Sequence, residues 1–132
     1  MSVLILVVDD EADVEMLFRQ QFRKDIREGR FTLEFALSAS DALARLARAN
    51  EARLILILSD INMPGMSGLE LLPKIKFSHP DVPVVMITAY GDASTRDKAL
   101  ALGAQDLLTK PVDFAALKAR INAHLVARGL AG

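Results

Sequence analysis

The sequence predicts an α/β domain whose parallel sheet is covered by helices on both faces. Short apolar runs at residues 3–8, 54–58 and 84–87 are each followed by polar or turn residues, as expected for buried strands. Stretches with the apolar spacing of helices lie between these runs. No repeat, low-complexity segment or flexible linker interrupts the 132 residues. The alternation favours one domain with right-handed crossovers.

Two weaker strand signals complete the predicted sheet. Residues 31–37 alternate between apolar and polar side chains, which indicates a strand with one face less buried. Residues 105–109 begin with two polar side chains and also look peripheral. We therefore expect the three apolar strands in the centre and these two at the edges. The strand order 2-1-3-4-5 meets that condition and is the flavodoxin-like arrangement.

Five helices are expected around this sheet. Four apolar residues at intervals of four predict the first helix. We expect this helix to be extended, with its end forming a partner surface. The fourth has the weakest apolar stripe. Ser38 and Asp41 fit a capping box before the second helix, and Asp113 can cap the fifth. The apolar residues of the five stripes are, in chain order, Val14, Phe18, Phe22, Ile26, Leu43, Leu46, Ala47, Leu69, Leu72, Ile75, Ala99, Leu100, Leu102, Phe114, Leu117, Ile121 and Leu125.

Composition excludes several classes of protein. The absence of cysteine removes disulfides and thiolate metal sites, and fits a reducing compartment such as the cytoplasm. The longest apolar run, residues 3–8, is far too short to span a bilayer, so no membrane association is expected. A net charge of −1, one tyrosine, no tryptophan and no arginine-rich face argue against direct nucleic-acid binding.

Polar side chains follow four of the predicted strands. Asp9 and Asp10 follow the first strand, Asp60 the third, Thr88 the fourth and Lys110 the fifth. In open parallel sheets ligands bind outside the carboxyl ends of the strands, so these groups are expected to meet at one edge. Taken singly, each is more simply a turn aspartate, a strand-end threonine or a solvated lysine. Their joint placement favours a functional site.

Three carboxylates at one edge need a counter-charge. At about 5 Å separation and an effective dielectric near 20, each pair repels by roughly 3 kcal/mol. One lysine cannot neutralise the cluster, but a divalent cation can. Oxygen ligands with positions left open favour Mg²⁺, whereas zinc is disfavoured because His79 and His124 lie far from the strand ends and are interpreted as surface or interface residues.

Asp60 is the best candidate for a nucleophile toward phosphorus, because it stands alone on the central strand between the other groups. Asp9 and Asp10 are better placed as metal ligands. Met63 and Met66 are interpreted as packing residues, and Gly65 and Gly68 as turn residues. Neither a G-x-G-x-x-G nor a Walker A pattern is present, so a nucleotide site lacks its usual phosphate cradle.

Five segments together resemble the response-regulator receiver domain of two-component signalling, over essentially the whole chain. They are ILVVDDE at residues 5–11, SDINMPGMSGLEL at 59–71, PVVMITA at 83–89, GA at 103–104 and LTKP at 108–111. The resemblance implies a receiver domain at residues 1–127 with a C-terminal tail at 128–132.

The resemblance assigns roles to the acidic residues. Asp60 would accept a phosphoryl group from a sensor histidine kinase or a histidine phosphotransfer protein. Asp10 and Asp60 would bind Mg²⁺ or Mn²⁺ directly, with Asp9 acting mainly through water and Asn62 through its backbone carbonyl.

The resemblance also assigns a phosphate-binding switch. Lys110 would pair with the phosphate, and Thr88, followed by Ala89, would move to hydrogen-bond it. The peptide bond before Pro111 is expected to be cis. Many receivers carry a tyrosine or phenylalanine where this chain has Leu107, so coupling is expected through packing of Leu107 or through Tyr90 instead.

By this resemblance the chain is a cytoplasmic phosphoacceptor rather than an enzyme, assisting only its own phosphorylation and dephosphorylation. Its output partner would be an effector protein or a fused output domain, and a homodimer through the fourth helix, fifth strand and fifth helix is a further option. The sequence leaves open the kinase, the stimulus, the output and whether the domain stands alone.

Two alternatives compete with this interpretation. A phosphohydrolase of the haloacid-dehalogenase type also uses a strand-end aspartate, but its second acid is replaced here by Asn62, which cannot protonate a leaving group. A receiver-like module that no longer accepts phosphate is disfavoured by the complete set of acidic residues with Thr88 and Lys110.

Overall fold

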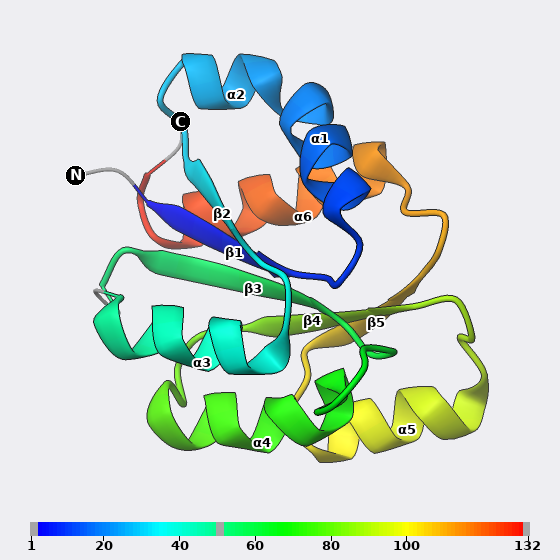
Figure 1. The fold of residues 1–132 in the computed structure, drawn as a ribbon. Coiled ribbons are helices and arrows are strands. Elements are labelled where there is room, and N and C mark those ends of the chain that lie inside the picture. The colour runs from blue at the N-terminus through cyan, green and yellow to red at the C-terminus, as the bar shows by residue number, and fades with distance from the viewer. Residues whose placement is uncertain (1–2, 50–51, 131–132) are drawn as a thin grey trace.

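The computed structural model describes residues 3–49 and 52–130, which form one parallel sheet between two layers of helices (Figure 1). The strand order is β2-β1-β3-β4-β5, so the predicted topology and both predicted edge strands are confirmed. The strands are β1 Leu4–Val8, β2 Thr32–Ala36, β3 Leu54–Asp60, β4 Val84–Thr88 and β5 Asp106–Thr109. The helices are α1 Ala12–Gln21, α2 Arg23–Arg27, α3 Ala39–Arg48, α4 Gly68–Ser78, α5 Ala93–Ala101 and α6 Phe114–Ala127.

The core is divided between the two faces of the sheet. Alternate side chains of β1 point to opposite faces, so Ile5 packs on the side of α1 and α6, whereas Leu6 packs on the side of α3 and α4. The three central strands β1, β3 and β4 are buried along their whole length. This burial on both faces explains why their sequences are continuous apolar runs.

The predicted first helix is wrong in one respect, because it is two helices, which makes six in the described residues instead of five. The helical path breaks at Phe22 (φ −108°, ψ 16°) between α1 and α2. The Phe22 side chain is 1% exposed and contacts the rings of Phe18, Phe31 and Phe114. The chain changes direction while this ring stays in the core, and apolar spacing alone does not reveal such a break.

Side-chain caps begin four of the helices. Asp113 accepts from the Ala116 amide at 3.1 Å, as predicted. The Ser38 hydroxyl accepts from the Asp41 amide at 3.0 Å, but the Asp41 carboxylate accepts from the Leu37 amide rather than closing a box. The full capping box instead joins Ser67 and Glu70 at the start of α4, and Asp92 caps α5.

The interpretation of His79 as a surface or interface residue is wrong. Its side chain is buried where α4 ends, and Nδ1 lies 2.8 Å from the Ser78 hydroxyl. His124 is half-buried on α6 with Nε2 3.1 Å from Gln105 Oε1, and burial together with Arg120 lowers its pKa. The expected tail at 128–132 follows α6, and its last two residues lie outside the described ones. No described helix has the length and apolar character that a bilayer span requires.

We expect Phe22→Ala to lower the free energy of unfolding by about 3–5 kcal/mol, because it removes a buried ring and leaves a cavity. Phe77→Ala is the matched control, since the Phe77 side chain is 91% exposed, and it should change stability by less than about 0.5 kcal/mol. Urea unfolding of both variants measures the difference. Equal effects of the two substitutions would contradict the role of Phe22 as the anchor of the α1–α2 break.

Candidate functional site

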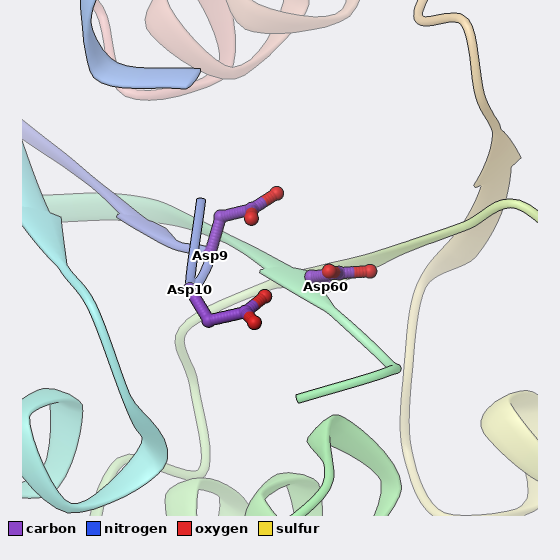
Figure 2. A group of neighbouring side chains, drawn as sticks. All are labelled: Asp9, Asp10 and Asp60. Carbon is purple, nitrogen blue, oxygen red and sulfur yellow. The ribbon is translucent and has the colours of Figure 1, made fainter. Parts of the chain in front are cut away.

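Three carboxylates meet at the carboxyl edge of the sheet. Asp9 and Asp10 directly follow β1, and Asp60 is the last residue of β3, the strand that pairs with β1 in the sheet. Each offers one oxygen that lies within 4.8 Å of the others, and Figure 2 shows the three side chains reaching into a common space. Asp9 is 7% and Asp60 4% exposed, whereas Asp10 is open to solvent. The predicted convergence of acidic residues is therefore present.

Backbone pairing fixes these carboxylates in place. The Asp9 amide donates to the carbonyl of Ala36 at 3.0 Å, which ties the end of β1 to β2. The Asp9 carboxylate also accepts from the Glu11 amide at 2.9 Å. Asp60 pairs with Ile87 of β4 in the sheet register. The acidic groups thus cannot separate without disturbing the central strands.

Lys110 supplies a positive charge from the end of β5. Its ammonium lies 3.3 Å from Asp60 Oδ2 and 3.5 Å from Asp9 Oδ2. Its amide donates to the Thr88 carbonyl at 2.8 Å, and its peptide bond to Pro111 is cis. One ammonium is therefore shared between two buried carboxylates.

The pKa shifts show that this sharing leaves the site under-neutralised. Burial raises the pKa of Asp60, the charge of Asp9 raises it further, and Lys110 only partly opposes both effects. Burial lowers the pKa of Lys110, but the charges of Asp9 and Asp60 outweigh it and the net shift is upward. Lys110 consequently stays cationic while Asp60 is held in an unfavourable negative environment.

The residues present fit a hard divalent cation. All three clustered donors are carboxylate oxygens, and Asp10 remains accessible from solvent. A cation with oxygen ligands would offset the burial of Asp60 and the charge of Asp9, which together raise the pKa of Asp60. The Asn62 carbonyl follows Asp60 by two residues and is the further ligand expected from the sequence.

Thr88 connects the site to the loop after β4. Its hydroxyl is buried and accepts from the Tyr90 amide at 3.1 Å and from Asn62 Nδ2 at 3.3 Å. Ala89 and Tyr90 are exposed, and the Tyr90 side chain is 72% accessible. The contact between Asn62 and Thr88 joins the loops after β3 and β4, and no local sequence pattern indicates it.

Leu107 lies away from the carboxylates. Its buried side chain belongs to the core on the α3–α5 side, and it pairs with Met86 in the β4–β5 register. Met63 is buried in the same core and Met66 packs against it, as their interpretation as packing residues requires. Leu107 is thus a core residue beside β4.

Gly68 has a role beyond the turn assigned to it from the sequence. It is the first residue of α4, and a Cβ there would lie 2.1 Å from the Asp60 carbonyl oxygen and 2.8 Å from Met86 Cε. Only glycine allows this approach. Gly65 has φ +75° and does serve as a turn residue. The M-P-G-M-S-G segment thus carries a packing constraint against the backbone of Asp60.

The five-stranded parallel sheet in this order, with an acidic cluster at the ends of β1 and β3, defines a flavodoxin-like receiver fold. The response regulator receiver domain family matches residues 5–122, and the chain belongs to that family. It is therefore a receiver domain of two-component signalling. Response regulators interact with histidine kinases and output domains, and receiver domains bind Mg²⁺ in an acidic pocket.

Individual relatives agree with this assignment. The response regulator protein PilR of Pseudomonas aeruginosa is 42% identical over 113 residues, which cover 86% of this chain and 24% of PilR. The chain spans about half or less of the length of the curated relatives that it matches.

Solved structures share the fold over nearly the whole chain. A CheY-like receiver domain protein from Methanospirillum hungatei superposes with a TM-score of 0.84 at 29% identity, covering 98% of both chains. A chain of the CheX–CheY–BeF3–Mg²⁺ complex from Borrelia burgdorferi has a TM-score of 0.80 at 26% identity, covering 92% of this chain and 87% of that one.

Because the pKa of Asp60 is raised, its folded form binds a proton more tightly than its unfolded form does. The free energy of unfolding therefore falls as pH rises from the unfolded-state value of about 3.9 through the raised pKa. In metal-free buffer we expect Asp60→Asn to be more stable than the unaltered chain at pH 7, with the difference vanishing below about pH 4.

Urea unfolding across this pH range measures the effect. Asp97→Asn, which changes an exposed carboxylate of α5, is the control and should change stability at pH 7 by less than about 0.5 kcal/mol. A destabilised Asp60→Asn at neutral pH would contradict the electrostatic account.

We expect millimolar Mg²⁺ to raise the melting temperature by about 2–6 °C, because a cation bound by the folded state stabilises it by mass action. Asp10→Asn should reduce the shift, whereas Asp97→Asn should keep it. Calorimetry with Mg²⁺ and with EDTA measures both. An unchanged transition in the unaltered chain would show that the acidic cluster is not a metal site of ordinary affinity.

Proposed function

We propose that Asp60 accepts a phosphoryl group from the phosphohistidine of a sensor histidine kinase or a histidine phosphotransfer protein. One observation carries the proposal: the buried Asp60 carboxylate ends the central strand with the Lys110 ammonium 3.3 Å away and two further carboxylates around it. Phosphoryl transfer needs mainly positioning and charge neutralisation, and this arrangement offers both.

In the proposed reaction an oxygen of Asp60 attacks phosphorus. The phosphorus–nitrogen bond of the phosphohistidine breaks, and its electron pair leaves with the imidazole nitrogen. Asp10 and Asp60, with Asp9 through water and the Asn62 carbonyl, would hold Mg²⁺ or Mn²⁺, which supplies positive charge at the transferring group. The water-exposed side of Asp10 leaves room for the donor.

Lys110 is proposed to pair with the phosphoryl group once Asp60 carries it. Its raised pKa keeps it cationic, and it already contacts the carboxylate that would carry the phosphoryl group. The added phosphoryl oxygens are stronger acceptors than a shared carboxylate, so the ammonium is expected to pair with them.

Thr88 is proposed to start the conformational switch. Its hydroxyl accepts from the Tyr90 amide and from Asn62, so turning it toward a phosphoryl oxygen costs both contacts. The direct bond to Tyr90 favours coupling through the loop of Ala89 and Tyr90. Leu107 packs on the neighbouring strand, and we propose for it a supporting role in the core rather than that of a rotating switch residue.

Helix α5 is the proposed moving element. Among its described residues only Ala99 is buried, so few apolar contacts oppose a shift. Phosphorylation would bias the equilibrium between two arrangements of this helix and the preceding loop. The output would pass to an effector protein, to an attached output domain or to a second copy through the face of α5, β5 and α6.

The remaining assignments are part of the same proposal. The domain would occupy residues 1–127 with a tail at 128–132, act in the cytoplasm, and catalyse only its own phosphorylation and dephosphorylation. Direct nucleic-acid binding is not proposed for it. The Asn62 amide, which donates to Thr88, is no proton source for a leaving group, and this favours a phosphoacceptor over a phosphohydrolase.

We expect acetyl phosphate or phosphoramidate with Mg²⁺ to add one phosphoryl group to the unaltered chain, and Asp60→Asn to abolish the addition, because the acceptor carboxylate is removed. Intact-mass spectrometry reads the added mass. Asp97→Asn is the matched control and should be labelled like the unaltered chain. Undiminished labelling of Asp60→Asn would refute the assignment, and no labelling with either donor would favour a module that has lost phosphate acceptance.

A further inference from the structure

The bend between α1 and α2 creates a groove that the phosphoacceptor chemistry does not use. The hollow has a volume of about 640 Å³, and we call it the α1–α2 groove. It lies along the second half of α1 and along α2, whereas the acidic cluster adjoins the start of α1. Its lining residues are Met16, Arg19, Gln20, Arg23, Ile26 and Arg27.

The groove carries positive charge that its surroundings neutralise only in part. Arg19, Arg23 and Arg27 follow one another at intervals of four residues, and no carboxylate lines the groove. Arg19 pairs with Glu15 at 3.0 Å, and the neighbouring Asp25 pairs instead with Arg30 at 2.8 Å. Within residues 3–49 and 52–130, neither Arg23 nor Arg27 forms an ion pair. The sequence interpretation that no arginine-rich face exists is therefore wrong for this local surface.

The groove also presents apolar surface. Met16 is 74% exposed although it is a large hydrophobic side chain, and Ile26 is half-buried against the core beneath α1. Methionine adapts its shape to irregular apolar partners. Exposed apolar surface beside cations is complementary to an amphipathic helix with an apolar face and an acidic edge.

The spacing of the two arginines that form no ion pair within the described residues matches such a helix. Arg23 and Arg27 lie four residues apart on α2, about 6 Å along its axis, which is also the spacing of carboxylates four residues apart on a partner helix. Arginine is suited to such pairing because its guanidinium can bind a carboxylate with two hydrogen bonds.

We propose that the α1–α2 groove docks an acidic amphipathic helix of a partner protein. Its charge complementarity selects carboxylates, and the exposed Met16 side chain offers an apolar contact to the apolar face of such a helix. The chain as a whole has a net charge of −1, so it has no long-range attraction for a polyanion such as RNA. This surface is separate from Asp60 and adds a partner contact to the proposed function.

The test uses a fluorescent helical peptide of about 16 residues with glutamate at every fourth position beside a leucine face. Fluorescence anisotropy should show binding to the full chain, and a scrambled peptide of the same composition should bind weakly. Amide shifts in NMR spectra should concentrate in residues 16–27. The double variant Arg23→Gln with Arg27→Gln should weaken binding about tenfold, because it removes two charge-assisted contacts.

The matched control is the double variant Lys74→Gln with Lys98→Gln, which removes the same charge from exposed positions of α4 and α5. It should leave peptide binding unchanged. Equal weakening by both double variants would reduce the effect to net charge and overturn the proposal. Absence of peptide binding at millimolar concentration would overturn it as well.

Parallel experiments test other occupants of the α1–α2 groove. Sedimentation with phosphatidylserine vesicles or with poly(U), and sedimentation equilibrium of the chain alone, should show no association that depends on Arg23 and Arg27. A dependent association in any of these, without peptide binding, would assign the groove to a lipid surface, a nucleic acid or a second copy and refute the proposal. Labelling by acetyl phosphate should be intact in Arg23→Gln with Arg27→Gln, so failure of the groove and failure of Asp60 phosphorylation are distinguishable.

Discussion

Repulsion among carboxylates that the sheet holds together is the constraint on which the rest of the site depends. Val8 pairs with Ser59 in the register of β1 and β3, so the residues that follow, Asp9 and Asp60, must be neighbours. Burial of Asp60 and the charge of Asp9 then raise the pKa of Asp60, and Lys110, 3.3 Å away, opposes both effects only in part. The apolar central strands supply the stability that tolerates this repulsion. Because these carboxylates repel one another at a partly buried site, any group that changes the charge there strongly changes their interaction energy.

Sequence patterning predicts most of this arrangement because the strands impose it. Continuous apolar runs mark central strands, and polar residues at their ends must share one edge. The features that patterning does not show depend on contacts between distant segments. The apolar spacing of α1 continues smoothly through Phe22, so only the surrounding aromatic rings reveal the break. The burial of His79 and the contact between Asn62 and Thr88 likewise have no local signature.

Charged contacts replace apolar packing on the flank formed by α5. Asp106 on β5 bridges Arg96 of α5 at 2.8 Å and Arg120 of α6 at 2.5 Å, while α5 itself buries only Ala99 among its described residues. Ion pairs with exposed partners contribute little to stability and are easily rearranged. Helix α4 is different, because it buries Leu71, Leu72 and Ile75 in the core. The two neighbouring helices thus differ in how firmly the sheet holds them.

Gly68 extends this difference between α4 and α5 to the rate of the proposed phosphorylation, because a glycine has no side chain to separate α4 from Asp60. Because α4 begins against the Asp60 carbonyl, a shift of the start of this helix would also shift the backbone of the proposed phosphoacceptor. A protein that binds α4 would therefore change the geometry of attack by Asp60, and with it the rates of the proposed phosphorylation and dephosphorylation. A protein that binds α5 would instead stabilise one of the proposed arrangements of this helix and its preceding loop. The rate of the proposed phosphorylation and the choice of conformation would in this way be controlled through separate helices on one sheet.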